Sequence, residues 1–169
     1  METIFALCTA PGKAGVAVVR VSGPLAWDAC NKLCGPVPEP RKLSLRVIRD
    51  HRGEPLDEAL VVCFEQEKSF TGEKICEFQL HGSAAVVAAV LGELGNCTEL
   101  KIAEAGEFTR QALENGRLDL AQVEGLADLI DAETEVQRQQ AQRVLAGSIG
   151  QLAKTCLLYT SDAADDSDC

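Results

Sequence analysis

Cysteine and histidine are the residue types here with the clearest capacity for chemistry, because thiolates and imidazoles bind metals and act as nucleophiles or bases. The 169 residues include 8 Cys but only 2 His. No paired-cysteine motif completes a tetrahedral metal site. We therefore expect reduced thiols, no metal and no catalytic residue. Most of the cysteines stand singly in apolar runs or in an expected helix: Cys8, Cys30, Cys34, Cys63 and Cys76.

Nucleotide chemistry would need a glycine-rich loop ending in Gly-Lys-Ser/Thr, whose backbone N–H groups surround the phosphates. The sequence offers only partial matches, since Gly12-Lys13 is followed by Ala14, and Gly72-Glu73-Lys74 has the wrong order. We therefore expect this chain alone neither to bind nor to hydrolyse GTP.

Composition and charge favour an ordinary globular protein with an aliphatic core. The residues are 46% hydrophobic, 25% charged and 4% aromatic. The formal net charge is −10, with Lys and Arg scattered, so the chain lacks the basic surface of an autonomous nucleic-acid binder. No apolar run approaches the roughly 20 residues that span a bilayer, and residues 1–10 lack the features of a signal peptide. We expect a cytoplasmic protein without a membrane partner.

The elements that must position any site alternate irregularly along the chain. Short β-branched runs bounded by turn residues predict strands at 4–9, 16–22, 43–50, 58–64, 75–81 and 99–103. Helices are expected over 24–34, ending at Gly35, and over 84–94. This mixed order predicts an α+β fold, a mixed sheet with helices, followed by the start of an all-α domain.

A helical period begins at Glu107. A short helix is expected to close at Asn115-Gly116, and a long one to open at Asp119, with Gln122 completing a capping box. We expect the long helix to need a partner helix from outside this chain. Its expected contact stripe is Val123, Leu126, Ala127 and Ile130.

The last residues, 156–169, differ in character from the rest. From Cys156 they read Cys-Leu-Leu-Tyr-Thr-Ser-Asp-Ala-Ala-Asp-Asp, which resembles a translated sequencing-library adapter. A native acidic terminus is the alternative. The expected organisation is a domain at 1–117, the beginning of a helical domain at 118–155, and a non-native tail at 156–169.

Four segments carry a family resemblance by their order and spacing. Together they resemble the start of the MnmE (TrmE) family of tRNA modification GTPases, over about residues 3–150. The segments are Pro11-Gly12-Lys13-Ala14-Gly15-Val16 with Val19-Arg20-Val21-Ser22-Gly23; Ser69-Phe70-Thr71-Gly72-Glu73; Glu77-Phe78-Gln79-Leu80-His81-Gly82; and Ala105-Gly106-Glu107-Phe108-Thr109-Arg110 continuing through Asn115-Gly116-Arg117-Leu118-Asp119-Leu120-Ala121-Gln122.

The resemblance implies a folate-binding, dimerising amino-terminal domain, followed by a helical domain that a GTPase domain interrupts. It also implies that the whole protein, with an MnmG (GidA)-type flavoprotein, forms 5-carboxymethylaminomethyl or aminomethyl uridine at the wobble position of tRNA. The implied cofactors are a tetrahydrofolate derivative, in the 5-formyl or methylene form, and GTP with Mg²⁺ and K⁺ in the domain absent here.

By the same resemblance, the folate contacts fall on Arg20, Glu77 and Arg117, where Arg117 stands in place of the family's Lys. A carboxylate can accept the paired N–H groups of a pterin, and a guanidinium suits the anionic glutamyl tail. Each residue also has a structural explanation. Arg20 could snorkel or form an ion pair, Glu77 could face solvent, and Arg117 could be helix-entry surface. His81-Gly82 and Ser69 to Glu73 are expected to be turns near the pocket.

Two other functions fit the sequence: a stand-alone folate-dependent one-carbon transferase resembling aminomethyltransferases, and a dimerisation module without a ligand. The coding sequence that follows residue 155 in the source genome would discriminate among the three. A phosphate loop there supports the GTPase, and a stop codon supports the others.

Overall fold

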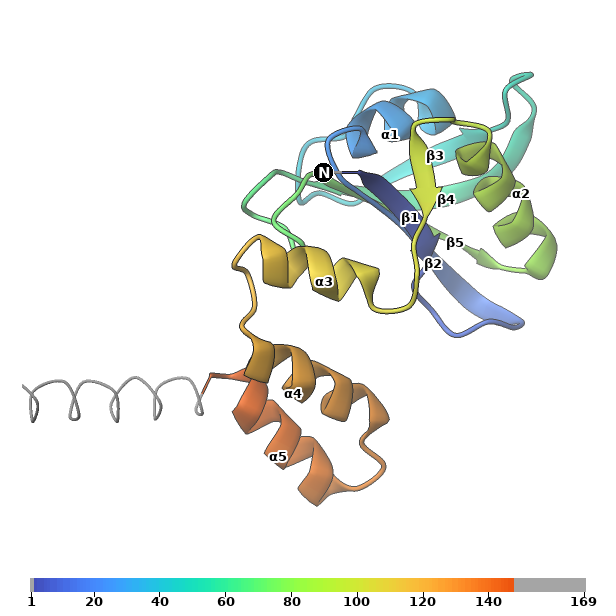
Figure 1. The fold of residues 1–169 in the computed structure, drawn as a ribbon. Coiled ribbons are helices and arrows are strands. Elements are labelled where there is room, and N and C mark those ends of the chain that lie inside the picture. Colours follow the sequence, from blue (N-terminus) through green and yellow to red (C-terminus); the bar gives the residue numbers. More distant parts are fainter. Residues whose placement is uncertain (1, 148–169) are drawn as a thin grey trace, which may run out of the picture. The chain divides into compact units, whose positions relative to one another are not determined.

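The structure is a computed structural model that describes residues 2–147. It divides into two compact units, one up to Ala112 and one from Leu113 onward. The α+β class is as expected from the sequence, and the order of strands and helices can be followed in Figure 1. The expected adapter tail and residues 148–155 lie outside the described part of the chain.

A mixed sheet of six strands, ordered β3-β4-β5-β2-β1-β6, forms the centre of the first unit. Neighbouring strands are antiparallel except for β1 and β6, which are parallel. The strands are β1 Thr3–Leu7, β2 Ala14–Ser22, β3 Ser44–Arg49, β4 Pro55–Phe64, β5 Ile75–Gly82 and β6 Leu100–Ile102.

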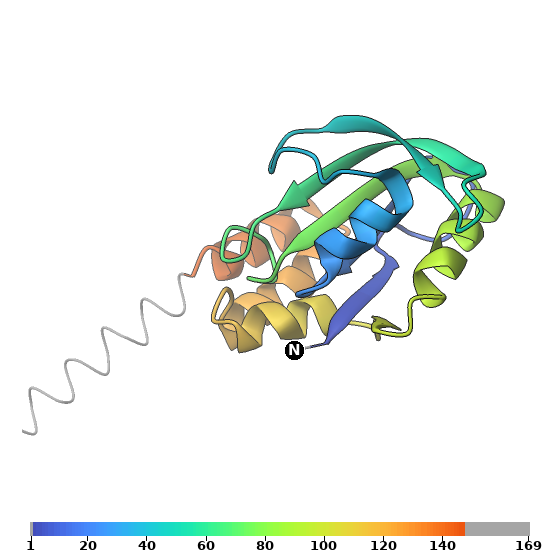
Figure 2. The same ribbon diagram turned by 90° about the horizontal axis from the view of Figure 1, so that it is seen from above.

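Two helices, α1 (Ala26–Cys34) and α2 (Ala84–Gly95), share one core with the same face of this sheet (Figure 2). The helix boundaries follow the sequence signals. Gly35 ends α1 with a φ of 78°, and the Ser83 hydroxyl accepts a hydrogen bond from the backbone N–H of Val86 at the start of α2. The aliphatic core expected from the composition is confirmed.

Several strand predictions need correction. β4 begins at Pro55 instead of residue 58, and β1 ends at Leu7 instead of residue 9. β2 begins at Ala14 instead of residue 16, because it continues beyond a register shift between Ala14 and Ala17. His81 and Gly82 belong to β5 and form no turn. A Cβ atom at Gly82 would lie 2.5 Å from the carbonyl oxygen of Ala14, so glycine is needed for this strand pairing.

The second unit contains a pair of helices, α4 (Leu120–Asp131) and α5 (Glu135–Leu145). The capping box of Asp119 and Gln122 is confirmed. The expected contact stripe is only partly correct: Val123 and Leu126 are half-buried, but Ala127 and Ile130 are exposed, and Gly125 is the buried residue of α4. Helix α5 packs on α4. Leu120, Ile130 and Val136 of this pair remain exposed, so a further partner helix from outside the chain stays a prediction. A Cβ at Gly125 would lie 2.9 Å from the backbone nitrogen of Leu145, so the missing side chain allows this close approach.

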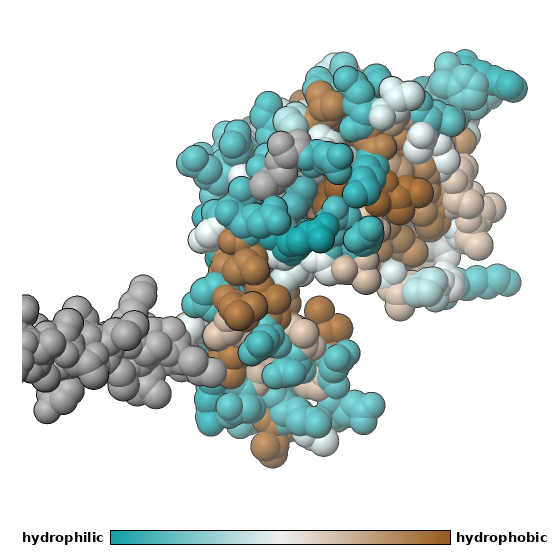
Figure 3. Space-filling model, viewed as in Figure 1, coloured by the Kyte–Doolittle hydropathy of each residue, from teal (hydrophilic) through white to brown (hydrophobic). Residues whose placement is uncertain are grey.

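Helix α3 (Glu107–Glu114) contains the boundary between the units and ends before Asn115-Gly116, as expected. Apolar patches interrupt the hydrophilic surface of both units (Figure 3). Among the described helices, none is long and apolar enough to cross a membrane.

Candidate functional site

Arg20 and Glu77 form an ion pair on the face of the sheet opposite α1 and α2. They are directly opposite each other on the neighbouring strands β2 and β5. Arg20 Nε and Nη2 each lie 2.8 Å from Glu77 Oε1. Only 22% of the Arg20 side chain and 17% of the Glu77 side chain are exposed. The structure therefore brings together two of the three residues expected from the sequence.

The hydrogen bonds of this pair leave part of the carboxylate available. Both guanidinium nitrogens reach Oε1, and Oε2 of Glu77 accepts no hydrogen bond from the described residues. An ionised carboxylate can accept about four hydrogen bonds. Glu77 can therefore bind a further donor while it remains paired with Arg20.

Two phenylalanine rings flank the guanidinium of Arg20. Its central carbon lies 5.4 Å from the ring centroid of Phe70 and 5.3 Å from that of Phe108. A cation within about 6 Å of a ring centroid is attracted by the π-electrons of the ring. The rings thus hold the guanidinium in one place, and they form apolar walls beside a charged pair.

A buried hydrogen-bond network ties together the segments that carry these rings. Ser22 Oγ lies 2.7 Å from Thr71 Oγ1 and donates to Gln111 Oε1 over 2.8 Å. Thr71 follows Phe70 in the loop before β5, and Gln111 lies about one helical turn after Phe108 on α3. The network therefore fixes the loop and the helix that position the two rings against Arg20.

The start of α3 is held by Glu107, which is buried. One oxygen of its carboxylate accepts from the backbone N–H of Glu104 at 2.7 Å, and the other accepts from Arg110 at 2.9 Å. The bond from Glu104, together with the charges of Lys101 and Arg110, lowers the pKa of Glu107 although burial opposes the shift. Glu107 thus remains charged and anchors the helix that carries Phe108.

The sequence motifs around the site have structural roles as well. The segment Ser69 to Glu73 is a turn, as expected, with Gly72 at a φ of 83°. His81 donates its backbone N–H to Asp57, whose other carboxylate oxygen lies 2.7 Å from His81 Nδ1. This pairing fixes His81 at the end of β5.

The charges of Arg20 and Glu77 affect the pKa of the Cys8 thiol. Desolvation raises its pKa, and the charge of Arg20 acts in the opposite direction. A protonated thiol is a poor nucleophile, so this shift disfavours nucleophilic attack by Cys8.

Arg117 is placed differently from the other two expected residues. It is exposed in the second unit, between α3 and α4. The geometry described for the site is therefore that of Arg20 and Glu77. Sequence reasoning missed Phe70 and Phe108 as contacts of Arg20, although both lie within the segments that carry the family resemblance.

The fold and this site define a class: an α+β domain that presents an arginine–carboxylate pair on one face of a mixed sheet, with two phenylalanine rings against the arginine. The family model for the GTP-binding protein TrmE N-terminus matches residues 3–117, and the chain belongs to this family.

Curated relatives carry the description tRNA modification GTPase MnmE. The protein of Roseobacter denitrificans is 58% identical over 151 residues, which is 89% of this chain and 35% of the relative. The protein of Ruegeria sp. (strain TM1040) is 60% identical over 153 residues, or 90% of this chain and 36% of the relative. This chain therefore spans about a third of the length of the relatives that it matches.

Proposed function

We propose that this chain is the part of a tRNA wobble-uridine modification GTPase that binds a tetrahydrofolate derivative and dimerises. One observation carries the folate proposal. Glu77 is held through one oxygen only by Arg20, whose guanidinium lies against two aromatic rings. A fixed carboxylate with a free oxygen beside apolar walls is suited to a flat heterocycle with N–H donors.

The chemistry of reduced folates matches both members of the pair. The pterin ring offers neighbouring N–H groups to Glu77, and charge-assisted bonds of this kind contribute about 1.5–3 kcal/mol each. Arg20, paired with Glu77, would make a polar contact at the pterin end of the ligand. The glutamyl tail is anionic and suits the exposed guanidinium of Arg117. We propose Arg117 as a charged contact of the ligand. The tail is the same in the 5-formyl and the methylene forms, so this contact does not depend on which form is bound.

The dimer proposal is supported by the outer face of the β3 edge strand. Leu45 is 58% exposed and lies opposite Leu60 of β4, which is exposed too. Val47, also exposed, shares the side of Leu45 because side chains alternate along a strand, and Leu43, just before the strand, is exposed as well. On the same side, Val62 of β4 lies opposite Glu77. A second copy that covers this apolar face would therefore border the Arg20–Glu77 pair.

The proposal for the whole protein follows the family. It acts as a GTPase with Mg²⁺ and K⁺ through residues outside this chain, works with an MnmG (GidA)-type flavoprotein on tRNA, and resides in the cytoplasm. The proposed boundaries are a folate-binding domain at 1–117 and a helical domain from 118.

The test of folate recognition is a calorimetric titration of the full 169-residue chain with 5-formyltetrahydrofolate. p-Aminobenzoylglutamate, which has the tail but no pterin, is the comparison ligand. We expect saturable binding of the reduced folate and much weaker binding of the tail alone. Equal affinities for the two ligands would contradict the assignment of Glu77 to the pterin, and no binding of either would contradict the folate proposal.

The dimer is tested by sedimentation equilibrium on wild type and Leu45→Glu. A buried charge without a partner is costly at an apolar interface, so Leu45→Glu should be monomeric where wild type is dimeric. Ile102→Glu is the matched control, because Ile102 is 68% exposed on β6, the opposite edge strand. A dimeric Leu45→Glu, or a monomeric wild type, would refute this interface.

A further inference from the structure

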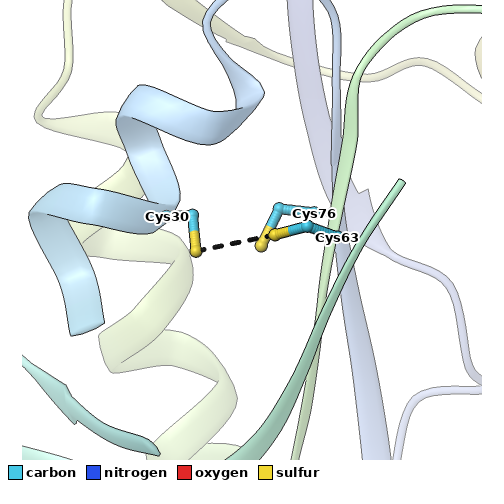
Figure 4. Close-up of side chains that lie close together, drawn as sticks. All are labelled: Cys30, Cys63 and Cys76. Atoms are coloured by element: carbon cyan, nitrogen blue, oxygen red, sulfur yellow. Dashed lines mark hydrogen bonds between the residues drawn. The ribbon is translucent and has the colours of Figure 1, made fainter. Parts of the chain in front are cut away.

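Three cysteine thiols from three elements meet in the core of the first unit. Cys30 lies on α1, Cys63 on β4 and Cys76 on β5, and all three side chains are fully buried. Their sulfur atoms lie within 4.8 Å of one another, and Figure 4 shows the three side chains pointing toward a common point. Cys63 and Cys76 are directly opposite each other in the sheet, and Cys30 Sγ lies 3.8 Å from Cys63 Sγ.

The spacing of the sulfurs suits one central atom. A three-coordinate thiophile with a lone pair binds its sulfurs as a pyramid, so bonds of about 2.3 Å at angles of about 95° place the three sulfurs about 3.4 Å apart. The observed 3.8 Å between the Cys30 and Cys63 sulfurs, and the 4.8 Å limit for the whole group, are somewhat longer than this, so the sulfurs must move closer together around a bound atom. Only small side-chain movements are needed to bring all three within bonding distance.

The apolar surroundings of the three cysteines disfavour a bound ion whose complex with the thiolates carries a net charge. The cluster is embedded in the apolar core formed by the sheet, α1 and α2. A monovalent ion with three thiolates would carry two negative charges, and a divalent ion would carry one. Such charges are expensive in a core without a paired cation.

We propose that Cys30, Cys63 and Cys76 form a binding site for a trivalent, three-coordinate thiophile of the arsenite class. Neutral As(OH)₃ reacts with three neutral thiols. Three As–O and three S–H bonds break, three As–S bonds form, and the three protons leave with the hydroxides as water. Arsenic stays trivalent, and no charge is left in the core.

A fourth thiol provides an internal control. Cys34 Sγ lies 3.6 Å from Cys30 Sγ, but it also donates to the carbonyl oxygen of Cys30 in its own helix. Cys34 is not one of the three residues whose sulfurs converge. Three-coordinate binding therefore requires Cys76 and does not require Cys34.

The experiment is a titration of the full chain with sodium arsenite, in the presence of a phosphine reductant that contains no thiol. Bound arsenic is counted by native mass spectrometry, and its sulfur neighbours are counted by arsenic X-ray absorption. We expect one arsenic per chain with three sulfur neighbours, and a raised melting temperature. If wild type binds no arsenic, or if bound arsenic has fewer than three sulfur neighbours, the proposal is overturned. This result needs no variant.

Variants locate the site. Cys76→Ala should weaken arsenite binding by about 100-fold or more, because the remaining pair loses the gain from a third tethered ligand. Cys34→Ala and Cys97→Ala should bind like wild type. Loss of binding in either control, or wild-type affinity in a folded Cys76→Ala, would contradict the assignment. Circular dichroism establishes that each variant is folded.

Discussion

Replacing Ser22 by alanine should destabilise the first unit by about 2–3 kcal/mol. The hydroxyl of Ser22 takes part in two buried hydrogen bonds, with Thr71 and with Gln111. Each such bond has a net worth of about 0.5–1.5 kcal/mol, and a buried acceptor left without a partner costs about 1–3 kcal/mol. In Ser22→Ala, Gln111 Oε1 loses the donor that the structure gives it. These contributions overlap, so their full sum is not expected.

The assay is equilibrium unfolding in urea followed by tryptophan fluorescence. Trp27 is the chain's single tryptophan, and its indole N–H donates to the carbonyl oxygen of Ile75 in the first unit. Its signal therefore reports the unfolding of that unit. Ser44→Ala is the matched control, because Ser44 is half-buried on the edge strand β3 and makes no side-chain hydrogen bond to the described residues. A loss below about 0.5 kcal/mol in Ser22→Ala would refute the role of the network, since surface changes commonly stay within that range.

Three further predictions concern the backbone, acid stability and nucleotide. Gly23→Ala should lower the free energy of unfolding, measured in urea, by more than about 1 kcal/mol, because Gly23 has a φ of 136° and a Cβ would lie 2.6 Å from Thr3 Cα. The control Gly92→Ala has open space in α2 and should stabilise the protein slightly. The lowered pKa of Glu107 contributes stability above about pH 4.3, the pKa of the carboxyl in the unfolded chain, and this contribution is lost as the pH falls through the folded pKa. In Glu107→Gln the free energy of unfolding should therefore fall less steeply as the pH is lowered. Calorimetry should detect no GTP binding by this chain, and saturable binding would contradict that expectation.

The secondary structure was largely predictable because the turn residues are explicit. Gly35 and Asn115-Gly116 end helices, and the capping box at Asp119 opens one. Apolar periodicity predicted the contact face of α4 only in part, since Val123 and Leu126 are half-buried but Ile130 is exposed. The helices approach each other where Gly125 has no side chain, and a hydropathy pattern does not weight such a residue.

The candidate site was predictable only in part. Arg20 and Glu77 came from a family resemblance, and their direct pairing depends on the register of two strands that are distant in sequence. Phe70 and Phe108 reach Arg20 only because a loop and a helix are tied to Ser22, which no local pattern encodes.

The convergence of the three buried thiols was missed for the same physical reason. Cys63 and Cys76 face each other only once β4 and β5 pair, and Cys30 reaches them only when α1 packs on that face. Single cysteines in apolar runs show none of this in the sequence.

Titration of 5-formyltetrahydrofolate into wild type and Glu77→Gln tests the central claim most directly. Glutamine keeps the shape of Glu77 but accepts at only one atom and presents a donor at the other, so affinity should fall by about 10- to 150-fold, or 1.5–3 kcal/mol. Glu135→Gln, which disrupts the exposed Glu135–Arg138 pair of α5, is the matched control and should bind as wild type does. Equal affinities for wild type and Glu77→Gln would remove Glu77 from the site and contradict the account.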